Sequence, residues 1–328
     1  MYSIHLPHTW NEAEVIQFLG QLCNLPDSIP ELNLDLQQTE FVEPFGVLLI
    51  AETIKTLVAQ RKMSGLRTYL TLPPETVHSS VQSYLTFFGF YDYIKGKALP
   101  YINSGKGRYV PLTLIQKDDI IDKTHGNENM QQVISQLSEQ LAEIIFSRIM
   151  EQTMTSYCFR EIIRNVFEHA ETDSCLIMAQ RWERREEAEI VVLDNGIGIY
   201  GSLAPTLGIS SIDAALSEAL RPGVSSKLKI DASEQWANSG FGLYILSQIG
   251  QELGEFFLAS NGRFVKIQST TDSPVFGEMP FFGGTVVKLR IELDVAEFFP
   301  NLLHRIVEEG EKMAPEGRKA SESSKMLS

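Results

Sequence analysis

Residues 157–169 read Tyr-Cys-Phe-Arg-Glu-Ile-Ile-Arg-Asn-Val-Phe-Glu-His, and this stretch decides how the second half of the chain is interpreted. Its apolar residues recur every three or four positions, which predicts a helix with one face against a core. Glu161, Asn165 and His169 are spaced four apart, so they form a polar column along that helix. A carboxylate can take a proton from water, and a carboxamide oxygen can bind a hard cation such as Mg²⁺. Taken alone, the pattern more often belongs to an ordinary amphipathic helix with a solvated face.

Three glycine-containing motifs follow this helix in the sequence. An apolar run ends in Asp194-Asn-Gly-Ile-Gly198, Ser239-Gly-Phe-Gly-Leu243 opens a predicted helix, and Gly283-Gly-Thr285 opens a predicted strand. Two of the motifs have an ordinary explanation, since Asp-Asn-Gly is a common hairpin turn and Ser239 is a suitable helix cap. Together, and in this order behind the polar column, they favour one shared binding site.

The order Glu-x-x-x-Asn, Asp-x-Gly-x-Gly, Gly-x-Gly-Leu and Gly-Thr resembles the GHKL ATPase superfamily, which includes gyrase, sensor histidine kinases and anti-sigma serine kinases. The resemblance covers roughly Met130–Leu293 and is closest in style to the anti-sigma serine kinases. It implies an ATP- and Mg²⁺-binding α/β sandwich of the Bergerat type, with helices on one face of a mixed sheet.

The resemblance implies a role for each matched residue. Glu161 would be the catalytic general base, Asn165 the Mg²⁺ ligand, and Asp194 the acceptor of the adenine amine. Glycines let a ligand approach the backbone closely, and free N–H groups at a helix start bind phosphate. The role of His169 stays open. The other residues implied in cofactor binding are Gly196, Gly198, Gly240, Gly242, Leu243, Thr285, Ser225 and Lys227.

The long segment Tyr200–Asn238 separates two of the motifs and resembles the ATP lid of the same superfamily. Its glycine, proline, serine and lysine content fits a closing loop. Arg221, Ser225 and Lys227 are its candidate phosphate contacts, although basic side chains in a loop are usually only solvated.

The first 115 residues predict a separate small α/β domain, in which strands alternate with helices. This order loosely resembles the STAS domains of anti-sigma-factor antagonists. The turn that carries a phosphorylated serine in those antagonists reads Glu43-Pro-Phe-Gly46 here, so a structural or partner-docking role remains for the domain. The predicted elements are strands at 2–6, 31–36 and 66–72, and helices at 10–22, 47–60 and 77–88.

The remaining boundaries follow from composition and periodicity. We expect a strand at 110–115 that completes the first domain, a polar junction at 116–129, and the ATP-binding domain at 130–295. Residues 296–328 are expected to form a helix from Glu297 to Met313 and a disordered tail. The elements predicted for the larger domain are a helix at 130–149 and strands at 174–182, 189–193, 256–259, 263–269 and 285–293.

Composition limits the function classes. The chain has 328 residues and a formal net charge of −14, which argues against general nucleic-acid binding. It contains no apolar run long enough for a membrane span, so we expect a cytoplasmic protein without a membrane partner. Cys23, Cys158 and Cys175 lack metal-ligand or disulfide spacing and are interpreted as core thiols.

Several functions remain open at this point. The first is a nucleotide-gated switch that hydrolyses ATP slowly and acts on a protein partner or through homo-oligomers. The second is a protein serine/threonine kinase of the anti-sigma type. An interaction module with a vestigial pocket is a third. A sensor histidine kinase ranks last, because no other histidine lies in a helix typical of a phosphoacceptor.

Overall fold

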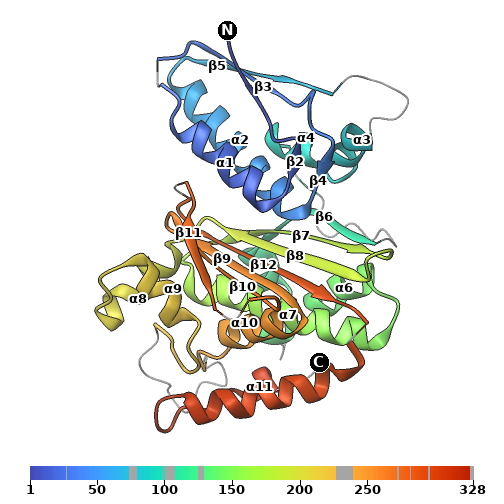
Figure 1. Cartoon of the computed structure of the whole chain (residues 1–328), viewed down its shortest axis with the longest axis vertical. Coiled ribbons are helices and arrows are strands. Elements are labelled where there is room, and N and C mark those ends of the chain that lie inside the picture. The colour runs from blue at the N-terminus through green and yellow to red at the C-terminus, as the bar shows by residue number, and fades with distance from the viewer. Residues whose placement is uncertain are drawn as a thin grey trace. The chain divides into compact units, whose positions relative to one another are not determined.

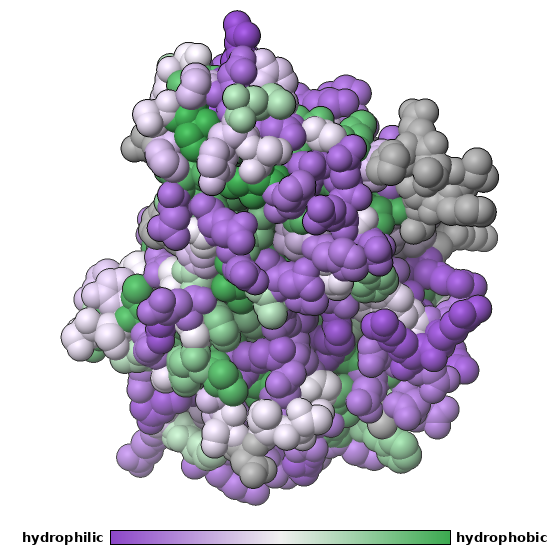
Figure 2. All heavy atoms as spheres, turned by 45° about the horizontal axis from the view of Figure 1, so that its top comes forward, coloured by the Kyte–Doolittle hydropathy of each residue, from purple (hydrophilic) through white to green (hydrophobic). Residues whose placement is uncertain are grey.

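The computed structural model describes residues 1–26, 28–73, 80–97, 99, 108–124, 129–226, 239–271, 273–280, 282–294 and 296–325. The chain is a mixed α/β protein that divides into two compact units (Figure 1). One unit comprises Met1–Tyr101 with Pro111–Thr113, and the other comprises Ile102–Val110 with Leu114–Ser328. Among these described residues, no helix combines the length and the hydrophobicity that a bilayer span requires. On the face drawn in Figure 2, hydrophobic residues are interspersed among hydrophilic ones.

The smaller unit is built around a parallel sheet in the order β1-β3-β5. Its elements are β1 (Tyr2–His5), β2 (Thr9–Trp10), α1 (Glu12–Cys23), β3 (Glu31–Asp35), β4 (Phe41–Val42), α2 (Pro44–Met63), β5 (Arg67–Thr71), α3 (Ser80–Phe87) and α4 (Phe90–Ile94). The strands and helices predicted for this part of the chain are confirmed where they are described. The segment 74–79 and most of 101–108, including a glycine-rich turn, lie outside the described residues.

Helix α2 begins earlier than the sequence predicted. Pro44 occupies its first turn, where the missing N–H of proline costs nothing, so the expected turn at 43–46 is the start of the helix. A side chain at Gly46 would place its Cβ 2.4 Å from the carbonyl oxygen of Trp10. Glycine is therefore required at position 46 because the helix packs closely against the backbone at Trp10.

The described part of the larger unit forms a sheet in the order β11-β10-β9-β12-β8-β7-β6. From β7 to β11 each strand runs antiparallel to its neighbour in the sheet. The strands are β6 (Tyr109–Gln116), β7 (Ser174–Trp182), β8 (Glu187–Asp194), β9 (Gly254–Ser260), β10 (Arg263–Gln268), β11 (Val275–Glu278) and β12 (Thr285–Glu292). The sequence predicted all of these except β11, a short strand whose residues are mostly exposed.

Helices cover one face of this sheet, and their apolar sides form the core with it (Figure 1). Helix α6 starts with a capping box, in which Asn129 and Gln132 each accept a backbone hydrogen bond from the other. The helices of the larger unit are α5 (Lys117–Asp122), α6 (Met130–Ile145), α7 (Ile149–His169), α8 (Gly198–Leu207), α9 (Ile212–Ala219), α10 (Gly242–Leu253), α11 (Phe299–Met313) and α12 (Glu322–Lys325).

The sequence placed the whole of strand β6 at the end of the first domain. The strand lies at an edge of the larger sheet, although its residues Pro111–Thr113 group with the smaller unit. The N–H of Arg181 donates to the carbonyl of Arg108 at 2.7 Å, which joins β7 to the start of β6. Val110, Ile115 and Ile120 belong to the core of the larger unit. The expected junction at 116–129 contains the helix α5, which buries Ile120 in this core.

The segment after α11 packs against the core, in contrast to the disordered tail that was expected. The hydroxyl of Tyr157 in α7 donates to the carbonyl of Ser324 at 3.1 Å, and both residues are buried. Lys325 forms an ion pair with Glu311 at 3.0 Å. Ala320 also belongs to the core cluster. The segment after α11 therefore makes specific contacts although its composition is polar.

Replacing Tyr157 with phenylalanine should lower the free energy of unfolding by about 1 kcal/mol, since a buried carbonyl loses its donor while the ring packing remains. Amide hydrogen exchange should also become faster at 320–325. Urea denaturation and exchange mass spectrometry measure the two effects. Tyr69→Phe is the matched control, because the Tyr69 hydroxyl makes an exposed hydrogen bond to Glu31. Equal stability loss in both variants would contradict the anchoring role of Tyr157.

Candidate functional site

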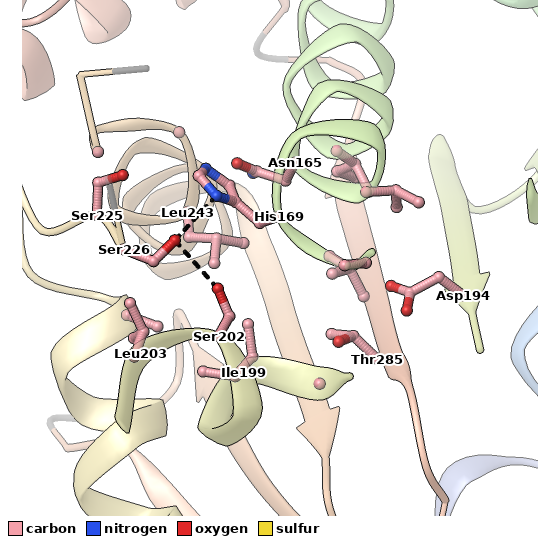
Figure 3. A pocket seen from close by; sticks show the side chains of 18 of the residues that line it. Asn165, His169, Asp194, Ile199, Ser202, Leu203, Ser225, Ser226, Leu243 and Thr285 are labelled. Atoms are coloured by element: carbon pink, nitrogen blue, oxygen red, sulfur yellow. Dashed lines mark hydrogen bonds between the residues drawn. The ribbon is translucent and has the colours of Figure 1, made fainter. Parts of the chain in front are cut away.

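The larger unit contains a cavity at one end of the sheet, between α7, the ends of β8 and β12, and the start of α10 (Figure 3). The cavity is open to solvent, and its wall is mostly apolar with a few polar groups, as in many ligand sites. The lining residues are Ile162, Asn165, Val166, His169, Ala170, Val192, Asp194, Gly198, Ile199, Ser202, Leu203, Ala219, Val224, Ser225, Ser226, Gly240, Gly242, Leu243, Thr285 and Val287.

Helix α7 brings Asn165 and His169 to this cavity, one helical turn apart as the sequence predicted. The Nδ2 atom of Asn165 is buried and has no hydrogen-bond partner among the described residues. A buried amide without a partner is costly unless a ligand or water completes it. The amide of Asn165 therefore marks an incomplete polar site.

Glu161 does not line the cavity. Its side chain is 0% exposed, and its Oε2 accepts a hydrogen bond from Nη2 of Arg164 at 2.8 Å. The Nε of Arg160 lies 3.6 Å from the other carboxylate oxygen. A Cβ built on Gly242 would lie 2.9 Å from Oε2 of Glu161 and 3.2 Å from Nδ2 of Asn165. The carboxylate thus lies directly behind the start of α10, with arginines around it.

Asp194 ends β8 and forms part of the cavity wall. Its side chain is 4% exposed, and its Oδ1 accepts a hydrogen bond from the N–H of Gly196 at 2.8 Å. Thr285, at the start of β12, is its cross-strand neighbour. Burial raises the pKa of Asp194 to about 6, against the opposing effect of backbone hydrogen bonds from Gly196 and Thr285. The site therefore holds a buried acceptor that is ionised at neutral pH.

The glycines next to Asp194 are required by the packing of the protein itself. A Cβ on Gly196 would lie 1.9 Å from the carbonyl oxygen of Ala170, and Gly196 does not line the cavity. Gly198 has a φ of +72° and does line it, with Asn261 close behind. The sequence interpretation assigned both glycines to ligand approach. In the structure, the position of Gly196 is explained by the crossing of two chain segments.

The start of α10 faces the cavity through Gly242 and Leu243. Phe241 precedes the helix and offers no side-chain cap to its first N–H groups. Ser239, the alternative cap, has a buried Oγ without a partner among the described residues. Helix N-termini of this kind carry a positive partial charge and bind anions. Gly240 is held in place by its carbonyl, which accepts from the N–H of Gly223 at 3.1 Å.

Serine side chains close the side of the cavity opposite Asp194 and Thr285 (Figure 3). Ser225 lines the cavity, as the sequence predicted, and so do Ser202 and Ser226, which sequence reasoning missed. No sequence pattern marks them, because α8 and the loop that carries Ser226 meet only in the fold. Lys227 lies outside the described residues. Arg221, the remaining phosphate-contact candidate, forms an ion pair with Glu218 at 2.9 Å.

Charged groups are scarce in the described cavity wall, which contains no lysine or arginine. Within the same described part of the chain, no group of three or more His, Cys, Asp and Glu side chains is arranged to hold a metal ion. A cation in this cavity would therefore need oxygen atoms of a ligand in addition to Asn165.

Comparison of the sequence with protein-family models finds no match. Comparison with curated proteins also finds no significant match. The functional assignment therefore depends on the residues and on the geometry described above.

Proposed function

We propose that the larger unit is a GHKL-type nucleotide-binding domain that binds Mg²⁺-ATP and regulates a protein partner. The observation that supports this proposal most strongly is the composition of the cavity wall. Asn165, Asp194, Gly242 and Thr285 come from four separate motifs, and all of them line one cavity. An acidic acceptor, an amide whose oxygen can bind a cation and an uncapped helix start suit the base, metal and phosphate parts of one ligand.

Each part of the ligand has a proposed binding group in this chain. The buried carboxylate of Asp194 accepts a hydrogen bond from the adenine amine, with Thr285 beside it. The N–H groups at Gly242 and Leu243 bind phosphate oxygens, and the backbone of Gly198 and Gly240 lines the same cavity. Asn165 contributes its amide oxygen to Mg²⁺, which neutralises phosphate charge when bound. Ser225 and Lys227 are the proposed further phosphate contacts.

The geometry around Glu161 favours a switch with slow turnover. Glu161 is the proposed general base, but its carboxylate is buried and bound by Arg164. A base must reach the attacking water, so hydrolysis requires the side chain to move past Gly242. We propose that bound ATP persists long enough to control a protein partner or homo-oligomer. The smaller unit, a proposed STAS-like domain, is the proposed docking element.

Calorimetric titration with Mg²⁺-ATP tests the proposed function, and its pH dependence tests the role of Asp194. Binding needs the ionised carboxylate as acceptor, and protons compete for it below its pKa of about 6. The affinity should be constant from pH 7 to 8 and fall toward tenfold per pH unit below about 6. The absence of any binding would refute the proposal.

Two controls separate Asp194 from other titrating groups. Adenosine lacks phosphates, so protonation of phosphate groups cannot change its affinity. Its affinity should therefore fall below pH 6 in the same way as that of ATP. The His169→Asn variant should retain the pH dependence, although His169 lines the same cavity. If the dependence disappeared in His169→Asn instead, the assignment of the adenine acceptor to Asp194 would be wrong.

A further inference from the structure

A chain of hydrogen bonds runs through the cavity wall between Ser202, Ser226 and His169 (Figure 3). The Ser202 hydroxyl donates to Oγ of Ser226 at 3.2 Å, and Oγ of Ser226 lies 3.2 Å from Nδ1 of His169. In the tautomer of His169 with hydrogen on Nε2, Nδ1 is an acceptor, and the hydroxyl of Ser226 donates to it. The hydroxyl of Ser226 is therefore aligned with a base.

The surroundings hold this pair in place. Thr206 of α8 donates its hydroxyl to the carbonyl of Ser226 at 3.3 Å, which fixes the backbone of the loop. A carboxylate oxygen of Glu168 lies 3.9 Å from Nε2 of His169, so it stabilises the imidazolium that forms when His169 takes up a proton. A hydroxyl, a base and an acidic group near the base form the arrangement of an activated nucleophile.

The pair lies close to the proposed phosphate end of the ligand. His169 follows Asn165 by one turn of α7, and Cβ atoms at that spacing are about 5–6 Å apart. Ser226, His169, Asn165 and Gly242 all line the same cavity. A triphosphate held at the start of α10 and by a metal ion at Asn165 extends over such a distance, so its terminal phosphoryl group can reach Oγ of Ser226.

We propose that Ser226 is a phosphorylation site within the cavity, modified by the nucleoside triphosphate that the same chain binds. This inference rests on the proposed function. The Oγ of Ser226 attacks the γ-phosphorus, and a new Oγ–P bond forms. The bond from the γ-phosphorus to the β,γ-bridging oxygen breaks, and the nucleoside diphosphate leaves with the electron pair. The proton of the hydroxyl passes to Nδ1 of His169.

The test uses the full-length chain, incubated with Mg²⁺ and ATP, followed by peptide mass spectrometry to locate phosphoryl groups. ATP binding is measured by calorimetry on the same samples. The natural chain should gain one phosphoryl group, on Ser226, and Ser226→Ala should gain none. Ser226→Thr retains a hydroxyl and should still accept the group. The control Ser217→Ala alters an exposed serine of α9 and should behave as the natural chain. His169→Asn should slow the transfer about 100-fold or more.

The outcomes distinguish the two proposals. Binding of ATP without modification of Ser226 overturns the phosphorylation site but leaves the nucleotide-binding function intact. Equal labelling of the natural chain and Ser226→Ala also overturns it, because another residue is then the acceptor. Transfer at the natural rate in His169→Asn removes His169 as the base. Absence of ATP binding overturns both proposals together.

Discussion

Replacing Asp194 with asparagine is expected to reduce the affinity for Mg²⁺-ATP about 100-fold, because a hydrogen bond to a charged group contributes up to about 3 kcal/mol. The carboxylate is buried at the end of β8 and is the only acidic side chain in the described cavity wall. An amide in its place can present its NH₂ group to the adenine amine, and two donors then oppose each other. Calorimetric titration at pH 8 measures the loss.

The same variant should be at least as stable as the natural chain at pH 8. Burial raises the pKa of Asp194 from 3.8 to about 6, so the folded state binds the proton more tightly than the unfolded state. The buried charge of Asp194 lowers the free energy of unfolding. This effect is absent below pH 4, grows as the pH rises to about 6, and then stays near its full value of about 3 kcal/mol. Asparagine has no charge to bury and removes this penalty.

Urea denaturation at pH 5 and pH 8 checks this second effect. The difference in unfolding free energy between the two pH values should be smaller in Asp194→Asn than in the natural chain. Asp213→Asn serves as the control, since Asp213 is a partly exposed partner of Arg263 and does not line the cavity. Marked destabilisation of Asp194→Asn at pH 8 would mean that the carboxylate is kept for folding and not for a ligand.

Replacing Glu161 with glutamine is expected to lower the free energy of unfolding by about 3 kcal/mol, because it removes the carboxylate nearest to the buried Arg164 and leaves that arginine with the more distant Glu168, at 3.8 Å, as its acidic neighbour. The carboxylate accepts from Arg164 at 2.8 Å, and both side chains are buried. The double variant Glu161→Gln/Arg164→Met removes both charges and should recover much of the lost stability. Denaturation of the natural chain, the two single variants and the double variant gives the coupling energy.

Phosphate release in the same set of proteins separates structure from catalysis. If Glu161 is also the general base, Glu161→Gln should bind ATP but release no phosphate, and the stable double variant should be equally inactive. Glu311→Gln provides the comparison, because Glu311 is paired with Lys325 and does not line the cavity. Full phosphate release by the double variant would exclude Glu161 as the base.

The sequence was most informative where candidate site residues lie within one helix or one strand, because their spacing then predicts which of them share a face. The spacing of Asn165 and His169 predicted a shared helix face, and both line the cavity. The apolar run before Asp194 predicted a strand end, which the structure confirms. Local spacing could not show that the column is divided, with Glu161 buried behind Gly242. That division results from the contact between α7 and α10.

The errors of sequence interpretation arise from contacts between distant segments. The strand β6 pairs with β7 across an intervening helical region, and no local pattern specifies that pairing. The contact of Gly196 with Ala170, in another segment, could not be predicted from the glycine motif itself. Ser226 carries no signal in a polar loop, and only the approach of α7 and α8 gives it its partners.

The position of β12 has a consequence for the folding of the larger unit. This strand comes last in the order of described strands along the chain, yet it lies between β8 and β9 in the sheet. Until β12 pairs, β8 and β9 each present an unpaired edge with mostly apolar residues. Such edges promote association between partly folded chains, and pairing over long sequence separations is slow. Folding yield should therefore decline with protein concentration more steeply than the stability of the finished sheet suggests.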